Sequence, residues 1–402
     1  MRRISIREGA GWQEYELSDA QAAELDHSRI VQVARGPRSG LWRVRDRGRV
    51  GTARLGLDAD AIEVHIRPKT AIRRLLFLVG YRMRGQDWRE DEVEAGEEPD
   101  LVPAMGQALA IAAERALRQG VLLGYRETEE ALPVVRGRIR EADQSRRHFT
   151  LPLPVEVRYD DYTIDIPENR LLRAAIEGML AQSGVLAPIQ VRLNHLLSRL
   201  QGVSRLVPGW PLPTWRPSRL NVRYHTALCL AELILRGASY ELDDGTSVQV
   251  DGLLLEMWQV FEDFVTLAMT DALRPHGGRC QPQDRAYHLD RARRVPLKPD
   301  LVWYRVDAGG REFPAAVLDV KYKLEKGAGQ QDLYQVLAYC TALGLDRGHL
   351  VYAEGDRLVH EIHRSGVEIT AHAFDLTLRP PALLAQVAAL AAEVAGAARG
   401  PR

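Results

Sequence analysis

The sequence is poor in cysteine, with three cysteines among 402 residues and no CxxC pair. Cys229, Cys280 and Cys340 are far apart in the chain, which argues against a disulfide framework and against a thiolate metal site. We therefore expect a protein of a reducing compartment, the cytoplasm.

Net charge and long apolar runs are absent as well. The 54 Lys and Arg residues balance 54 Asp and Glu residues, so DNA binding would have to come from local basic patches. The apolar stretches at 75–79 and 383–397 are short or interrupted by Gln386 and Glu393, and the amino-terminal residues lack the apolar core of a signal peptide. We expect no membrane span and no membrane partner.

No GxxxxGK[ST] phosphate-binding loop occurs in the sequence. Such a loop supplies the backbone N–H groups and the lysine that cradle nucleotide phosphates. Any nucleotide hydrolysis associated with this protein would therefore have to come from another chain.

Hydrophobic residues make up 46% and charged residues 27% of the chain, as in a globular protein of two or three domains. Residues 1–85 resemble short strands closed by a helix near Ala71–Tyr81, residues 101–240 have mainly helical spacing, and residues 250–402 alternate helix and strand. The predicted fold class is α+β multidomain, with a β-rich N-terminal domain, a helical middle domain and a C-terminal α/β domain.

Helix and strand patterns can be assigned to individual segments. Helices are predicted at Leu101–Gln119, Pro167–Leu180, Tyr224–Arg236, Leu254–Leu273, Gln331–Leu343 and the C-terminal Ala/Leu-rich segment, and proline in the first turn supports the second of these. Residues 134–157 are predicted to be extended. Strands are predicted at Ile4–Leu17, Ile30–Val33, Leu41–Val44, Val50–Leu57, Ile62–Arg67, Ala286–Arg294, Lys298–Arg305, Phe313–Tyr322, His349–Ala353, Val359–His363 and Val367–Phe374.

An acidic run at 90–100 separates the first two regions and surrounds Gly96 and Pro99. Dense charge with glycine and proline is typical of a solvated linker. A metal or partner site is the alternative, and the linker is the favoured interpretation.

Two segments with the apolar pattern of strands also contain charged residues. Asp300 lies in Leu297–Val302, and Asp319 and Lys321 lie in Val317–Lys323. On a strand, alternate residues share a face, so Asp319, Lys321 and Lys323 would point together while their neighbours point away. If the two strands pair, Asp300 can lie beside Asp319, and buried strands rarely carry charge without a function.

Phosphodiester hydrolysis uses such a set of residues. Asp300 and Asp319 could hold Mg²⁺, with Mn²⁺ as a substitute, and Lys321 could orient the attacking water and offset charge on the phosphate. Glu262 on the preceding helix could add a carboxylate, with Asp263 as the competing candidate. This is the PD-(D/E)xK pattern of restriction-endonuclease-like domains. The alternative is a pair of surface carboxylates and an ion-paired lysine.

Basic and polar residues near this set are candidates for contacts with double-stranded DNA. Residues 285–298 contain five basic side chains and one acid, although a solvated hairpin would have the same composition. Gln335 on the following helix could contact DNA or the site, or could be a neutral surface glutamine. The DNA-binding candidates are Arg291, Arg293, Arg294, Lys298, Lys323 and Gln335.

Several words in order resemble the McrC family across nearly the whole chain. They are the segments 63–69, 132–139, 159–172 and 261–265, followed by the words around Asp300 and Asp319. The resemblance implies the endonuclease subunit of a 5-methylcytosine-type restriction system. It also implies a partner, an McrB-like AAA+ GTPase or ATPase ring, and a docking role for residues 1–85.

The resemblance carries catalytic roles to Asp300, Asp319 and Lys321, and less directly to Glu262. Arg136 and Arg138, which flank Gly137, could contact DNA or the partner, or could be structural. Two other functions stay open at this point: an adaptor that activates an AAA+ partner through a dormant nuclease fold, and a nuclease that acts alone.

Overall fold

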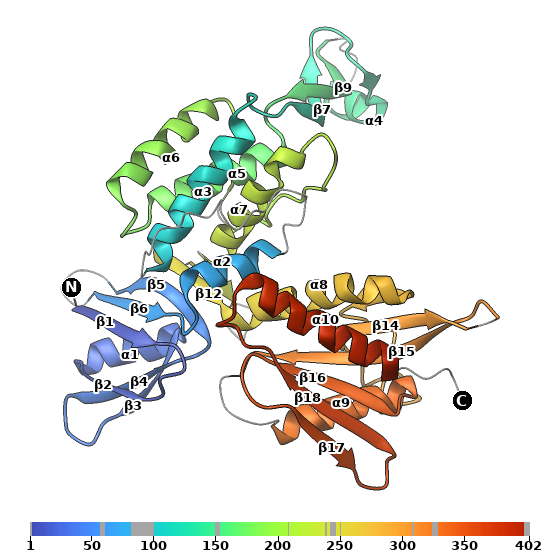
Figure 1. Cartoon of the computed structure of the whole chain (residues 1–402). Coiled ribbons are helices and arrows are strands. Elements are labelled where there is room, and N and C mark those ends of the chain that lie inside the picture. Colours follow the sequence, from blue (N-terminus) through green and yellow to red (C-terminus); the bar gives the residue numbers. More distant parts are fainter. Residues whose placement is uncertain are drawn as a thin grey trace. The chain divides into compact units, whose positions relative to one another are not determined.

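The computed structural model describes residues 2–56, 61–81, 100–148, 153–207, 209–237, 239–241, 247–249, 251–307, 309–323 and 329–397. They form a mixed α/β protein with several sheets (Figure 1). Contacts divide the chain into two compact units, Met1–Leu101 with Leu254–Arg402, and Val102–Leu253. The first and last of the predicted regions thus belong to one unit. Most of the acidic run lies outside the described residues, so its interpretation stays a prediction.

The N-terminal part of the first unit contains two sheets. One has the order β1-β6-β5-β12 and the other the order β2-β4-β3. Alternate residues of β1 are buried, which agrees with the alternating pattern of its sequence, whereas β6 buries Val64, His65 and Ile66 in succession. The elements are β1 (Arg2–Arg7), β2 (Gln13–Glu16), α1 (Asp19–Ser28), β3 (Val31–Arg35), β4 (Leu41–Asp46), β5 (Arg49–Leu55), β6 (Ile62–Arg67), α2 (Ile72–Tyr81) and β12 (Asp251–Glu256).

Two features of this part differ from the sequence prediction. The strand expected at Ile4–Leu17 is two strands, β1 and β2, which belong to different sheets. Helix α1 was not predicted, although Ser18 and Gln21 form a capping box, with Ser18 Oγ accepting from Gln21 N at 3.1 Å and Gln21 Oε1 accepting from Ser18 N at 3.1 Å. A capping box starts a helix even where the apolar periodicity is weak.

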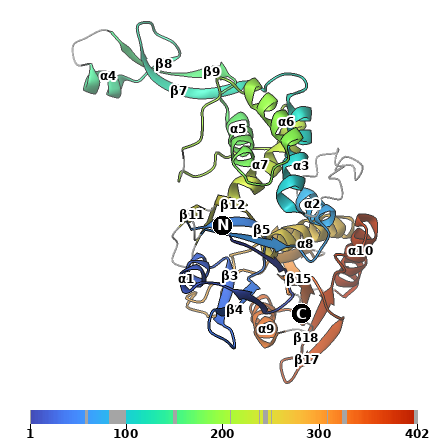
Figure 2. The ribbon, with the colours of Figure 1, turned by 90° about the vertical axis from the view of Figure 1, so that its left-hand side faces the viewer.

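A six-stranded sheet forms the C-terminal part, in the order β13-β14-β15-β16-β18-β17. Strand β15 is antiparallel to β14 and parallel to β16, which is parallel to β18. Figure 2 shows this part turned by 90°. Its elements are α8 (Met257–Leu273), β13 (Arg279–Pro282), β14 (Leu301–Val306), β15 (Glu312–Lys321), α9 (Gln330–Leu343), β16 (Arg347–Tyr352), β17 (Leu358–Ile362), β18 (Val367–Ala373) and α10 (Pro380–Ala397).

Helix α9 packs on one face of this sheet. Val336, Tyr339 and Cys340 of the helix share a buried cluster with Val317 of β15 and Leu350 of β16. The close approach requires glycine at 348, because a Cβ there would lie 2.4 Å from Val336 Cγ1. Helix α8 contacts β15, and α10 contacts α8. The helices therefore fix β15, the strand that carries Asp319 and Lys321.

The structure corrects one boundary and one predicted strand in this part. The helix predicted from Leu254 begins at Met257, because the preceding residues complete strand β12. The strand predicted at Ala286–Arg294 is wrong: this segment is a loop with a single bridge between His288 and Pro296. A turn forms instead, in which Asp290 Oδ1 accepts from Arg294 N and Val295 N at 2.8 Å and Arg293 has φ of 56°.

Helix α10 is long and apolar enough, by length and composition, to cross a membrane, and it is the one such helix among the described residues. Leu383, Val387, Leu390 and Val394 are buried, at the spacing of one helical face, and the helix packs against α8. Such a helix is weak support for a membrane span, since the core helix of a globular protein has the same length and composition.

The second unit combines helices with a three-stranded sheet of order β7-β9-β8. Gly106 of α3 lies against Met179 of α5 and Ile189 of α6, where a Cβ would be 3.3 to 3.4 Å from their side chains. The predicted helix at Pro167–Leu180 is confirmed with the same bounds. The main elements are α3 (Leu101–Leu117), β7 (Gly124–Leu132), β8 (Arg138–Ile139), α4 (Glu141–Arg147), β9 (Val155–Thr163), α5 (Pro167–Leu180), α6 (Ala187–Arg199) and α7 (His225–Gly237).

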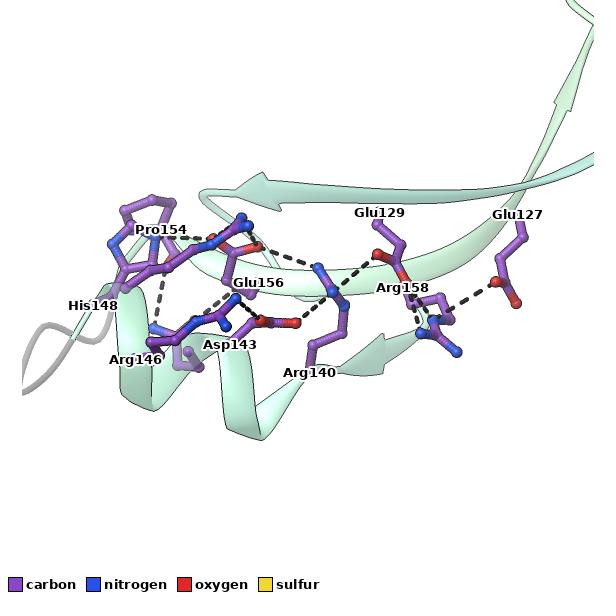
Figure 3. A network of polar contacts seen from close by, with 11 residues as sticks. Glu127, Glu129, Arg140, Asp143, Arg146, His148, Pro154, Glu156 and Arg158 are labelled. Atoms are coloured by element: carbon purple, nitrogen blue, oxygen red, sulfur yellow. Dashed lines mark hydrogen bonds and ion pairs between the residues drawn. The ribbon is translucent and has the colours of Figure 1, made fainter. Parts of the chain in front are cut away.

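A network of ion pairs holds the short helix α4 against this sheet (Figure 3). Glu156 of β9 is 2% exposed, and its carboxylate accepts from His148 Nε2 at 3.2 Å and from Arg147 Nη1 at 3.4 Å. Arg140 pairs with both Glu129, at 2.9 Å, and Asp143. The segment 134–157, which was expected to be extended, therefore contains a helix. Since α4 has no buried residue, its polar contacts rather than apolar packing hold it on the sheet.

Candidate active site

The ends of β14 and β15 bring Asp300 and Asp319 together. Leu301 pairs with Leu318 in the antiparallel register, so Asp300 immediately precedes, and Asp319 immediately follows, a directly paired position. Asp300 Oδ2 accepts a hydrogen bond from the backbone N–H of Val320 at 2.7 Å. Asp319 is 1% exposed. The sequence prediction that these two acids meet is therefore matched by their placement.

Lys321 lies on the same face of β15 as Asp319. Its Nζ is 2.7 Å from Asp319 Oδ2, and the lysine side chain is half-buried. Val317, two residues before Asp319, faces α9, so this face of the strand is the α9 side. The carboxylate and the ammonium thus share one environment, as the alternating sequence predicts.

Burial and mutual repulsion change the proton affinities of this group. Burial, followed by the charge of Asp319, raises the pKa of Asp300 to about 6. Burial also raises the pKa of Asp319, against the lowering effect of Lys321. Burial alone would lower the pKa of Lys321, but the charges of Asp319 and Asp300 hold it above its usual value. Two carboxyls crowded in this way bind a proton, or a cation, more readily than isolated ones.

The donor set fits a hard divalent cation. Both carboxylate oxygens of Asp319 are buried: Oδ2 pairs with Lys321 Nζ at 2.7 Å, whereas Oδ1 has no hydrogen-bond partner among the described residues. Unsatisfied buried carboxylate oxygens are costly unless a proton or a cation binds them. No group of three or more His, Cys, Asp or Glu side chains with metal-binding geometry occurs among the described residues. Mg²⁺ commonly needs only one or two carboxylates, with water and phosphate as the other ligands.

Glu262 lies close to this pair on helix α8. Burial, followed by the charge of Asp300, raises its pKa. Its Oε1 accepts from Gln283 Nε2 at 2.9 Å. Asp263, the competing candidate, has an exposed side chain. Of the two acids, Glu262 is the half-buried one, and its pKa is raised in part by the charge of Asp300.

Three residues near the site were not predicted from the sequence: Asp332, Tyr339 and Tyr352. Asp332 of α9 is 5% exposed and accepts from Lys323 Nζ and from Tyr352 OH, the latter at 2.8 Å. Its charge acts on both Asp319 and Lys321. Tyr339 OH donates to the carbonyl of Lys298 at 3.1 Å. The cue in the sequence was weak: Asp332 stands next to glutamines at the start of a helix, where an acid is ordinary.

The predicted DNA-binding residues lie in different settings. Arg291, Arg293, Arg294 and Lys298 are exposed in the loop before β14, and Arg294 Nε is 3.5 Å from Asp290 Oδ2. Lys323 is paired with Asp332. Gln335 is half-buried and donates to Tyr339 OH at 2.7 Å. The loop arginines and Lys298 are thus the most accessible of the set, and contact with DNA stays a prediction.

Comparisons with known proteins bear on the fold of the chain. The chain is similar in fold to a chain of a Thermococcus gammatolerans assembly described as McrB AAA+ hexamers with bound McrC, with 16% identity, a TM-score of 0.53, and coverage of 98% of this chain and 100% of that one. A second structure, of the Thermococcus gammatolerans McrBC complex, matches at 16% identity and a TM-score of 0.40 over 67% of this chain and 88% of the other. No curated protein matches the chain.

A family model extends the comparison to the sequence itself. The model described as "McrBC 5-methylcytosine restriction system component" matches residues 44–353, well over half of the 402 residues. That range contains Glu262, Asp300, Asp319 and Lys321. The chain therefore belongs to the family of McrBC 5-methylcytosine restriction system components.

Proposed function

We propose that this protein is the Mg²⁺-dependent endonuclease subunit of a modification-dependent restriction complex and that it hydrolyses DNA phosphodiester bonds. The observation that carries the proposal is the pairing of the half-buried Asp300 with the buried Asp319, with Lys321 Nζ 2.7 Å from Asp319 Oδ2. Membership of the McrBC family supports the same reaction class. The C-terminal sheet with α8 and α9 would be the PD-(D/E)xK domain.

Each residue has a role in this reaction. Asp300 and Asp319 would hold the cation, whose chemistry is to polarise the phosphate and to lower the pKa of a bound water. Lys321 would orient the attacking water and stabilise negative charge on the phosphate oxygens. Glu262, held by Gln283, would accept a hydrogen bond or a proton from that water.

DNA would approach along the loop before β14. The exposed side chains there are basic, and cationic groups beside a metal site hold the phosphate backbone in register. Lys298 is two residues from Asp300, which places a cation close to the bond that is cut.

The partner would be an McrB-like AAA+ ring that reads the modified base and hydrolyses nucleotide in a cytoplasmic complex. The solved assembly with the similar fold is described as containing McrB AAA+ hexamers and McrC. The present sequence has no phosphate-binding loop of its own, so the motor activity would come from that partner.

The proposal is tested with the complex reconstituted from the full chain and its AAA+ partner. With Mg²⁺, nucleotide and methylated DNA, the wild-type complex should cut. Asp319→Asn, Asp300→Asn and Lys321→Ala should each reduce cutting by about 1000-fold or more while nucleotide hydrolysis is still stimulated. The exposed Asp356→Asn is the matched control.

Other results would overturn the proposal. Stimulated hydrolysis with no cutting by the wild type, under Mg²⁺ or Mn²⁺, would identify an adaptor. Cutting by the wild-type chain without partner or nucleotide would identify a nuclease that acts alone.

A further inference from the structure

Tyr322 joins the two elements that carry the candidate catalytic residues. It directly follows Lys321, the last residue of β15, and it contacts helix α8, whereas Lys321 lies on the α9 side of the strand. Its ring lies against Phe261 of α8, with ring centroids 5.8 Å apart. Phe261 in turn directly precedes Glu262. One aromatic side chain thus directly follows Lys321 in the chain and contacts the residue that directly precedes Glu262.

Glu8, at the end of β1, holds the hydroxyl of that tyrosine. Tyr322 OH donates to Glu8 Oε1 at 2.7 Å, and the backbone N–H of Lys69 donates to Glu8 Oε2 at 2.9 Å. Glu8 is 1% exposed, and its backbone N–H donates to the carbonyl of Arg67 at 2.9 Å. The carboxylate is fixed on both oxygens, so it provides a rigid acceptor for Tyr322 rather than a mobile surface group.

A second contact links the loop after β6, which contains Lys69, to the chain after β16. Lys69 Nζ pairs with Glu354, which follows the end of β16. Strands β15 and β16 are parallel, with Lys321 opposite Tyr352 in their register. The loop after β6 therefore contacts the chain just beyond Tyr352 directly, and it is linked to the chain just beyond Lys321 through Glu8. These contacts lie at the end of the sheet where the candidate active site is built.

We propose that Glu8 and Tyr322 are positioning residues for the nuclease: the N-terminal strand fixes Tyr322, and Tyr322 sets the placement of Lys321 relative to Glu262. This inference rests on the proposed function. Buried hydrogen bonds behind a reacting group commonly determine its orientation, and losing one lowers activity by about 10- to 100-fold. The N-terminal part would then be required for cutting even when DNA and partner are bound.

The first test measures cutting by the full chain in its reconstituted complex. Tyr322→Phe keeps the ring against Phe261 and removes only the hydroxyl. We expect single-turnover cutting at saturating DNA to slow by about 10-fold, with the half-saturating DNA concentration unchanged. Glu8→Ala should slow cutting to the same extent as Tyr322→Phe. Glu8→Gln keeps an acceptor oxygen and should slow cutting less.

The control is Tyr15→Phe. Tyr15 OH donates to the carbonyl of Ser5 in β1, the strand that Glu8 follows, and to Gln13 Oε1, and none of its described contacts reaches the C-terminal sheet. We expect normal cutting. Equal cutting by Tyr322→Phe and the wild type would overturn the inference, and so would an equal loss in Tyr15→Phe.

A second readout needs no cutting activity. Amine acylation of the full chain, followed by mass spectrometry, gives the labelling rate of Lys321 relative to the exposed Lys298. Loosening the ion pair with Asp319 should raise that ratio by about threefold in Tyr322→Phe, and leave it unchanged in Tyr15→Phe.

The two readouts separate the two proposals. If the wild type does not cut but the ratio rises, the proposed function fails and the positioning contact stands. If the wild type cuts and the ratio does not change in Tyr322→Phe or Glu8→Ala, the positioning contact fails and the proposed function stands.

Discussion

Gln283 holds Glu262 and Asp300 at the same time: its Nε2 donates to Glu262 Oε1 at 2.9 Å, and its backbone N–H donates to the carbonyl of Asp300 at 3.0 Å. Gln283 has φ of 45°, a left-handed conformation that side chains other than glycine rarely adopt. A strained residue that contacts two candidate catalytic acids indicates that its conformation serves the site.

Replacing Gln283 separates this role from stability. In Gln283→Gly the side-chain bond is lost while the positive φ becomes favourable, so the free energy of unfolding should change by less than about 1 kcal/mol. Single-turnover cutting should fall by about 10-fold, because Glu262 is no longer fixed. Denaturant unfolding and cleavage assays measure the two effects, with Gln281→Ala in the adjacent strand as the control. Normal cutting by Gln283→Gly would remove Gln283 from the site.

The raised pKa of Asp300 predicts a pH dependence of stability in the metal-free chain. Since its pKa in the folded state, about 6, exceeds the ordinary 3.8, its stabilising contribution is complete below about pH 4 and is lost as pH rises through 6. Asp300→Asn, which mimics the neutral form, should therefore be more stable than the wild type at pH 8, on the order of 2 kcal/mol, and similar at pH 4. The measurement is urea unfolding across this range.

The Asp356→Asn chain is the control, because this aspartate is exposed. It should follow the wild type at every pH. An Asp300→Asn chain that is destabilised equally at pH 4 and pH 8 would show that Asp300 is not held in a charge-repelling, buried environment.

A buried histidine pair predicts the opposite pH dependence. His349 Nδ1 and His372 Nε2 are 3.2 Å apart on β16 and β18. Burial lowers the pKa of His349 to about 3 and that of His372 to about 4. Their contribution to stability is therefore complete above the ordinary pKa of 6.5 and is lost as pH falls toward 4 and 3.

His372→Gln should make the loss of stability between pH 6.5 and 4 less steep, because one group no longer has to stay neutral in the fold. The exposed His363→Gln is the control. Acid titration of unfolding measures the slope. An unchanged slope in His372→Gln would mean that the pair does not contribute to acid unfolding.

The candidate site was predictable where local patterns determine it. Alternation along β15 put Asp319 and Lys321 on one face, and an antiparallel neighbour brought Asp300 beside them. Pro167 marked the start of α5 because proline suits the first turn of a helix. These features depend on residues a few positions apart, which a single sequence displays directly.

The parts that the sequence did not reveal depend on distant contacts. Glu8 reaches Tyr322 across 314 positions, and no periodicity connects the two. Gln283 acquires its role through a turn whose positive φ no sequence rule places at glutamine. The charged segment at 286–294 resembled a strand, but backbone bonds to Asp290 made it a loop.

The most direct test of the central claim is the position of a bound divalent ion. Crystals of the full chain in Mn²⁺ should give one anomalous peak within roughly 2.0–2.3 Å of a carboxylate oxygen of Asp300 and of Asp319, and Asp319→Asn should abolish it. A peak held by other residues, or none at a Mn²⁺ concentration that supports cutting, would contradict the account.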